Sequence, residues 1–154
     1  MVKSHCVEDK IEHYMNSYLE DLRKTGMSLI IYKDGEIIFS SYSHGIRPHL
    51  EAIKKLGRST LKGTVMADKI VGRAAALLIL YSEADEVHAL LISTGGKEVL
   101  QSKCKKIIYV EETNAIKVQD GRIFCPFEQM VQGISDPVEA YNEMIAKMAE
   151  LQTL

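Results

Sequence analysis

An aspartate and a lysine, Asp68 and Lys69, stand side by side at the head of an apolar run that continues to Leu80. The run is apolar on nearly every side of a helix, so the sequence predicts a central helix from Ile70 to Leu80, packed by neighbours all round. A carboxylate at the start of a helix accepts hydrogen bonds from the free amides of the first turn, which alone accounts for Asp68. A cation there is mildly unfavourable, so Lys69 is either a solvated side chain or a group held for a ligand.

A second candidate site lies in the stretch CPFEQM. Pro126 suits the first position of a helix and therefore places Cys125 at or near the cap. The exposed amides and the helix dipole favour the thiolate of a cysteine in that position, which makes it a reactive nucleophile. Glu128 is placed either to bond back to the Cys125 amide as a capping-box acid or to accept a proton in a pocket. The alternative for Cys125 is a small buried thiol that fills core space.

The third candidate is a turn in which an expected strand passes into an expected helix. Backbone amides in such a turn form a cradle for an anion, and helix starts that follow parallel strands lie at the sheet edge where ligands bind. The turn lacks the GxxxxGK[ST] spacing of a phosphate-binding loop, so the alternative is a tight connection with no ligand. Its predicted ligand-binding residues are Ser93, Thr94, Gly95, Gly96 and Lys97.

The histidines and cysteines show none of the spacings that recur in metal sites. The chain has three cysteines far apart and neither a CxxC nor an HExxH motif, so we expect no metal, no cofactor and no disulfide framework. His44 and His49 flank a loop and are expected at the surface. His88 falls inside an expected strand, where a partly buried, hydrogen-bonded side chain is the usual outcome.

Several further elements must position these groups. Apolar residues between Ile11 and Leu22 recur at helical spacing, and Gly26 ends that helix. Asp34-Gly35 joins two short apolar strands in a hairpin. Strands at 86–93 and 105–112, with a helix from the glycine turn to about 103 between them, predict parallel βαβ units. A second hairpin is expected over 115–125, then a short helix and a last helix capped by Asp136.

Length, composition and net charge indicate the general class of the protein and the kinds of partner that it is expected to lack. The 154 residues, 46% apolar and 26% charged, fit one globular domain over 1–154. A net charge of −2 gives no general attraction to nucleic acid or anionic membranes. The longest apolar run, Ala74 to Tyr81, is too short for the ~20 residues that span a bilayer, and the N-terminus has no signal-peptide core. We therefore expect a cytosolic protein whose partner is neither nucleic acid nor a membrane.

Three stretches, MADKIVGRAAALL, KGTVMADK and CPFEQM, together resemble a family known as a domain of unknown function, DUF1893. The resemblance runs from about Leu29 to Met130. It implies a cytidine-deaminase-like α/β fold, a three-layer α-β-α sandwich whose mixed sheet has an antiparallel hairpin followed by parallel βαβ units. In zinc deaminases of this fold a histidine and a glutamate open the helix after the hairpin, and two cysteines open the next one. By element order those positions fall at 67–69 and 93–96, where the metal ligands are missing.

Three functions stay open. The first is a metal-free enzyme on a small nucleotide-like or otherwise anionic molecule, with Cys125 as nucleophile or redox group, Asp68 or Glu128 as proton acceptor and Lys69 holding the anion. The second is a binding or regulatory module that uses the same pocket without turnover. The third is an assembly protein, a homo-oligomer joined through its terminal helices. The apolar stripes of those helices, which serve equally as ordinary core, hold Tyr14, Met15, Tyr18, Tyr141, Met144 and Met148.

Overall fold

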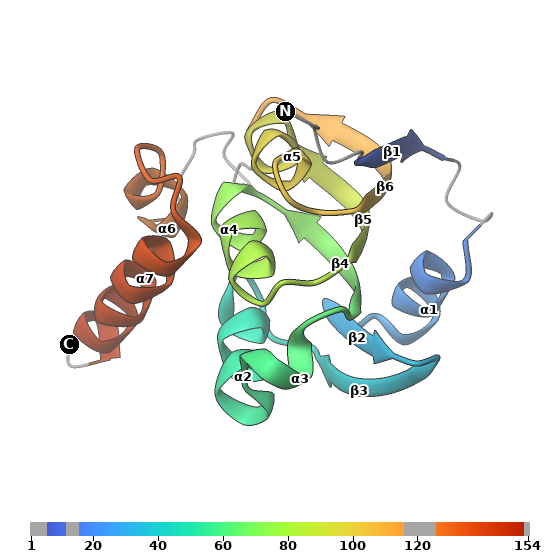
Figure 1. Ribbon diagram of the computed structural model, residues 1–154, viewed down its shortest axis with the longest axis horizontal. Helices are drawn as coiled ribbons and strands as arrows, with labels where there is room; N and C mark the ends of the chain where they lie inside the picture. The colour runs from blue at the N-terminus through green and yellow to red at the C-terminus, as the bar shows by residue number, and fades with distance from the viewer. Residues whose placement is uncertain (1–5, 12–15, 116–125, 153–154) are drawn as a thin grey trace.

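The computed structural model describes residues 6–11, 16–115 and 126–152. Their helices and strands alternate along most of the chain (Figure 1). In order they are β1 Val7–Lys10, α1 Ser17–Thr25, β2 Leu29–Lys33, β3 Glu36–Ser41, α2 Arg47–Leu56, α3 Arg58–Leu61, β4 Val65–Val71, α4 Arg73–Tyr81, β5 Glu86–Ser93, α5 Thr94–Gln101, β6 Lys106–Thr113, α6 Pro126–Met130 and α7 Pro137–Gln152.

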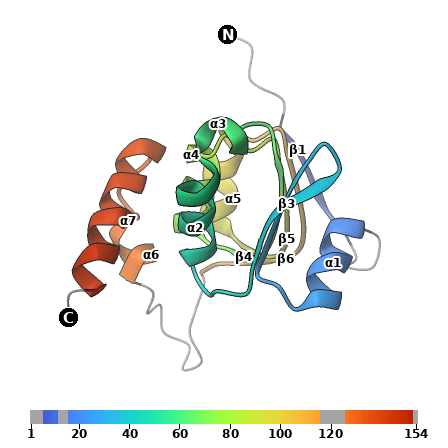
Figure 2. The same cartoon turned by 90° about the horizontal axis from the view of Figure 1, so that it is seen from below.

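The described strands form one six-stranded mixed sheet in the order β1-β6-β5-β4-β2-β3. The hairpin strand β2 pairs antiparallel with both β3 and β4, whereas β4, β5, β6 and β1 run parallel to their neighbours. Helix α1 covers one face of the sheet, and α2, α4 and α5 cover the other (Figure 2). The predicted three-layer α-β-α class with a mixed sheet is confirmed. Helices α6 and α7 pack outside α4, away from the sheet (Figure 2).

The central helix is α4, and it carries the core. Every residue from Ala74 to Leu80 is buried, because a helix that is apolar on all sides is stable only when neighbours surround it. Small residues let those neighbours approach closely. A Cβ added at Gly96, in the first turn of α5, would lie 2.9 Å from the carbonyl oxygen of Gly72.

The predicted start of this helix is wrong. Val65–Val71 is strand β4, bonded to β2 on one side and β5 on the other, and Gly72 is the N-cap of α4. Asp68 and Lys69 therefore lie inside a strand, and Asp68 does not cap the helix. Gly72 and Arg73 mark the boundary between strand and helix, but apolar residues continue on both sides of them, so the predicted helix was extended across it.

The signals at turns and helix ends are confirmed where the structure describes them. Asp34 and Gly35 take φ angles of 52° and 81° in the β2–β3 turn, and Gly26 ends α1 at φ 74°. At the start of α7 the Glu139 amide donates to the Asp136 carboxylate at 3.0 Å. The predictions at these positions are correct because a positive φ angle and the free amides of a helix start are each compatible with only a few residue types.

Other elements depart from the prediction. The described part of the N-terminal helix begins at Ser17 and is capped by the Asn16 side chain, and β1 precedes it as an unpredicted edge strand. The segment between the β2–β3 hairpin and β4 forms helix α2 and, directly after it, the short helix α3. The hairpin expected over 115–125 lies outside the described residues except at its first position.

Candidate functional site

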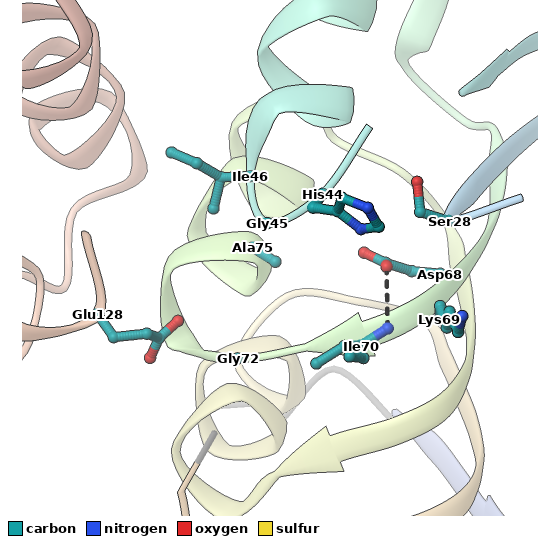
Figure 3. Close-up of a pocket in the computed structure, with 10 residues that line it drawn as sticks. All are labelled: Ser28, His44, Gly45, Ile46, Asp68, Lys69, Ile70, Gly72, Ala75 and Glu128. Atoms are coloured by element: carbon teal, nitrogen blue, oxygen red, sulfur yellow. Dashed lines mark hydrogen bonds between the residues drawn. The ribbon is translucent and has the colours of Figure 1, made fainter. Parts of the chain in front are cut away.

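A cavity of about 250 Å³ opens between the starts of α2 and α4, at the carboxyl end of β4. Three of the four predicted catalytic residues lie in its wall; Cys125, the fourth, is outside the described residues. Four separate parts of the sequence, at Ser28, 44–46, 68–75 and Glu128, thus meet here (Figure 3). The lining residues are Ser28, His44, Gly45, Ile46, Asp68, Lys69, Ile70, Gly72, Ala75 and Glu128.

Asp68 is a buried carboxylate in this wall, with only 6% of the residue exposed. Alternation along β4 turns its side chain toward α2, where its Oδ2 lies 2.6 Å from Nε2 of His49. The Ile70 amide donates to Oδ1 at 3.2 Å (Figure 3). Burial of a carboxylate is costly unless partners replace its water, so these two contacts hold the group in place at the cavity.

His49 supports Asp68 from behind the pocket wall and is 2% exposed. A carboxylate accepts hydrogen bonds but does not donate them, which assigns the proton of this contact to Nε2. The other ring nitrogen, Nδ1, is buried and has no hydrogen-bond partner among the described residues. An unsatisfied buried nitrogen destabilises the fold by about 1–3 kcal/mol. The pair is therefore not explained by stability alone.

Two of the residues that line the pocket, Lys69 and His44, have exposed side chains. Lys69 is fixed through its backbone, whose amide donates to the Ser28 carbonyl at 2.9 Å. In the described ranges no carboxylate lies within ion-pair distance of its ammonium. His44 is exposed on the opposite wall, and its ring faces the Asp68 carboxylate across the cavity (Figure 3). His44 is therefore free to meet a solute in the cavity, whereas alternation along β4 directs the Lys69 side chain to the opposite face of the sheet from Asp68.

The start of α2 adds uncapped backbone amides. Its N-cap residue, Ile46, makes no side-chain hydrogen bond to the first turn, and that turn contains no acidic residue. Gly45 and Ile46 themselves line the cavity. The positive end of the helix dipole therefore opens into the pocket on the same side as His44.

The start of α4 is already capped, and Glu128 is the cap. Its Oε1 accepts from the Ala74 amide at 2.9 Å and its Oε2 from the Arg73 amide at 3.2 Å. Arg73 in turn donates from Nε to the Val131 carbonyl at 2.8 Å, which fastens α6 to α4. Glu128 thus caps a helix 54 and 55 positions away in the chain, whereas its predicted partner, the Cys125 amide, lies outside the described residues.

The glycine turn at 93–97 lies apart from the cavity lining. Ser93 accepts from the Gly96 amide at 2.9 Å and so caps α5. Thr94 donates to Glu112 at 2.9 Å, and the Lys97 ammonium lies 2.7 Å from Glu112 and 3.0 Å from Glu8. Hydrogen bonds to these two carboxylates raise the pKa of Lys97 well above its usual range. Carboxylates hold the polar groups of this turn, which leaves the amide cradle a prediction without structural support.

The predictions made for His88 and His49 from their positions in the sequence had opposite outcomes. His88 is 2% exposed and bonded through both ring nitrogens, to Asn16 at 3.0 Å and Glu86 at 3.1 Å, which confirms that prediction. His49 was expected at the surface, and that prediction is wrong. It shares the buried face of α2 with Ala52 and Ile53, three and four positions on, a helical spacing that would have identified it. His49-Leu50-Glu51 is also an HxE triplet, a second signal that was missed.

The terminal helices pack inward through their described aromatic and methionine side chains. Tyr18 lies 4.8 Å from the Tyr32 ring and 4.6 Å from the His88 ring, measured between centroids. Tyr141 stacks on Tyr81 at 4.1 Å, and Met144 is fully buried. Tyr14 and Met15 lie outside the described residues. The large apolar side chains that α7 leaves exposed are Val138, Ile145 and Leu151.

Comparison with known proteins identifies the family. A family model described as a domain of unknown function, DUF1893, matches residues 17–148. The chain belongs to this family. A crystal structure of a DUF1893 protein, TM1506 from Thermotoga maritima, is similar at a TM-score of 0.77 and 30% identity, covering 93% of this chain and 95% of that one. None of the curated proteins matches the chain.

Two searches of the described residues bear on partners of the site. No group of three His, Cys, Asp or Glu side chains within 6–11, 16–115 and 126–152 is arranged to hold a metal ion. Within those same ranges, no helix is both long and apolar enough to cross a membrane.

Proposed function

We propose that this DUF1893 protein binds a small molecule, nucleotide-like or otherwise anionic, in the cavity between α2 and α4. The observation that carries the proposal is Asp68, a buried carboxylate held at the cavity by His49 at 2.6 Å. A buried pair of this kind is weak evidence for stability, whereas clefts with a few fixed polar groups are the usual form of ligand sites. Asp68 would accept a hydrogen bond from a donor group of the ligand.

The anionic part of the ligand would lie at the other side of the cavity. There the uncapped start of α2 supplies the positive field, and the exposed His44 ring can hydrogen-bond to the anion. Glu128 already fills the corresponding position at the start of α4. The two helix starts therefore differ, and the site has one place for an anion and one for a donor group.

We also propose that the scaffold is a cytidine-deaminase-like fold. Its support is the antiparallel hairpin followed by parallel βαβ units, with the cavity at two successive helix starts. The helix after the hairpin is α2. In this fold the positions of the deaminase zinc ligands would therefore be the starts of α2 and α4, and not 67–69 and 93–96 as expected from the sequence. In the signature H-x-E followed by P-C-x-x-C, His49 and Glu51 correspond to the first part. Gly72 and Ala75 stand where the cysteines would be.

Zinc does not fit this set of residues. Gly72 and Ala75 carry no side-chain ligand atoms, and Nε2 of His49 is bonded to Asp68. Glu51 is exposed and accepts from the Ser43 hydroxyl at 3.0 Å. No step of zinc deamination can be assigned to these residues, which favours a ligand site that works without that metal.

Ligand binding is tested by thermal-shift and equilibrium-dialysis measurements with nucleoside 5′-monophosphates and with small dicarboxylates. Wild-type protein is expected to be stabilised by a member of one set, and Asp68→Asn to bind it at least about tenfold more weakly. Glu98→Gln, at an exposed position of α5, is the control and should bind as wild type. Failure of every compound in both sets to stabilise wild type, or equal binding by Asp68→Asn, would contradict the proposal.

A second candidate is a metal-free enzyme that uses the same cavity. A carboxylate oriented by an imidazole is the arrangement of a proton acceptor, and Cys125 remains the predicted nucleophile. Mass spectrometry of the bound compound separates the two candidates, because a binding module returns it unchanged. A single domain over 1–154, a cytosolic location and the assembly role stay predictions.

A further inference from the structure

The two edges of the sheet differ in how they are protected. Strand β1, at one edge, has only four residues, of which three are charged: Glu8, Asp9 and Lys10. Strand β3, at the other edge, has six residues with Glu36 as its single charge. Edge strands of natural proteins are commonly short, charged or interrupted by proline, which prevents pairing with another chain. Strand β3 has a β-bulge at Ile38 as its one protection of this kind, and the part of the strand beyond the bulge, from Phe39 to Ser41, is uncharged and contains no proline.

Apolar side chains accompany this open edge. Ile37, within β3, is 57% exposed, and Tyr42, directly after it, is 61% exposed. These two are the most exposed large hydrophobic residues among those that the structure describes. Ile37 pairs with Tyr32, which packs under α1, so it faces the α1 side of the sheet. Exposed apolar residues beside unpaired backbone indicate an interaction surface.

The backbone of Ser40 offers the hydrogen bonds. The Ser41 carbonyl accepts from the Ser28 amide at 2.9 Å, on the β2 side of the strand. Neighbouring residues in a strand direct their N–H and C=O groups to opposite sides, so Ser40 directs both groups to the open edge. An added antiparallel strand would satisfy them.

We propose that two copies of the protein pair antiparallel through β3, which joins their sheets into one. Charge along the edge favours a second copy as the occupant. The hairpin end carries Asp34 and Glu36 beside Lys33, whose ammonium donates to the Thr60 carbonyl at 2.7 Å, whereas the other end of the strand leads to Arg47. Antiparallel pairing about a two-fold axis near Ser40 places the acidic end of each copy beside the basic end of the other.

The pairing also affects the cavity. The acidic hairpin end of one copy then lies toward the segment that follows β3 in the other copy. That segment contains His44, which lines the cavity, so the acidic end of each copy lies near the mouth of its partner's site. A parallel arrangement would instead place Glu36 against Glu36, which is repulsive. The proposal does not depend on what the cavity binds.

Mass measurement by light scattering across a series of protein concentrations tests the pairing. Wild-type protein is expected at twice the chain mass of 17.3 kDa. Ser40→Pro removes one edge hydrogen bond from each copy, and the dimer dissociation constant is expected to rise on the order of 30-fold. Ile37→Lys, an exposed position, is expected to weaken the dimer by charge repulsion if Ser40→Pro fails to fold. Val7→Lys, equally exposed at the β1 edge, is the control and should remain dimeric.

Hydrogen exchange at the Ser40 amide identifies the surface used. In the dimer this amide is expected to exchange more slowly as protein concentration rises, whereas the Val7 control leaves that dependence unchanged. A wild-type protein that stays monomeric up to high micromolar concentration would overturn the proposal. So would a dimer whose mass is unchanged in folded Ser40→Pro and Ile37→Lys, for example one that pairs through α7 or recruits a different partner.

Discussion

Asp68 and His49 act as a unit, because neither side chain is stable in its position without the other. Replacing His49 with alanine leaves the Asp68 carboxylate buried without its main partner. Loss of one member of a buried pair typically destabilises a protein by about 3–5 kcal/mol. We therefore expect His49→Ala to lower the free energy of unfolding by roughly that amount, measured by urea denaturation.

The double variant His49→Ala with Asp68→Ala is the control for this coupling. It removes both partners of the hydrogen bond, so it should be destabilised by less than the sum of the two single variants, with a coupling of roughly 1–3 kcal/mol. Additive effects would show that the two side chains do not depend on each other.

The three cysteines are expected to differ in reactivity. Burial is the main factor that raises the pKa of Cys104, to about 11, and burial also raises that of Cys6. The nucleophile in alkylation is the thiolate, so both should react slowly with iodoacetamide below pH 8. A fast-reacting thiol in folded wild type should therefore disappear in Cys125→Ser. If no thiol reacts faster than a free cysteine, the predicted catalytic role of Cys125 is wrong.

At the scale of elements, the start of α4 depends on a cap supplied by another helix. Glu128→Ala removes both acceptors of the Arg73 and Ala74 amides. Loss of a capping side chain costs about 0.5–2 kcal/mol, and that decrease is expected in the free energy of unfolding. Glu98→Ala, exposed on α5, is a matched control with little expected effect. Equal stability of the two variants would show that the cap contributes nothing.

Two adjacent glycines of α5 make a second matched pair. A Cβ at Gly96 would lie 2.9 Å from the Gly72 carbonyl oxygen, whereas a Cβ at Gly95 meets no atom within 4 Å. Forcing backbones apart in a packed core typically costs 1–3 kcal/mol, so Gly96→Ala should be destabilised by about that amount. Gly95→Ala should be neutral or gain up to about 1 kcal/mol, since alanine is the better helix former. A stable Gly96→Ala would contradict the close helix approach.

These elements also show what the sequence could predict. Turn chemistry predicted the β2–β3 hairpin at Asp34-Gly35 and the end of α1 at Gly26, because those backbone angles are open to few residue types. The boundary between β4 and α4 was misplaced because short apolar segments on both sides of Gly72 do not distinguish a strand from a buried helix by their spacing. The partner of Asp68 was equally hidden. His49 lies 19 positions away, and only the fold brings the two together.

At the scale of the whole molecule, the two faces of the sheet are covered unequally: α1 lies on one face, and α2, α4 and α5 lie on the other. Helix α1 alone covers the face on which Ile30, Tyr32 and Ala67 form a small core of their own. Helix α1 is also joined to the sheet by hydrogen bonds. Asn16, the N-cap of α1, donates from Nδ2 to Nδ1 of His88, and the His88 Nε2–H donates to Glu86. Attachment of this layer therefore depends on the protonation of one buried imidazole.

That dependence predicts how stability changes with pH. Burial is the main cause that holds the pKa of His88 below the 6.5 of a free side chain. As pH falls below about 6.5, the unfolded chain takes up a proton that the folded protein resists, so stability is present above that pH and lost below it. The free energy of unfolding should fall by up to about 1 kcal/mol between pH 7 and 5.5.

His88→Gln is the variant that separates this effect from others, because glutamine does not titrate. Its unfolding free energy, measured by urea denaturation at pH 7, 6 and 5.5, should vary less with pH than that of wild type. The ionisation of Glu112 does not contribute to the change in unfolding free energy between pH 7 and 5.5. Its bond to Lys97 is the main cause that lowers its pKa below 4.5, so its own contribution is lost only at more acidic pH. Identical pH dependence in wild type and His88→Gln would show that α1 is not anchored through a neutral His88.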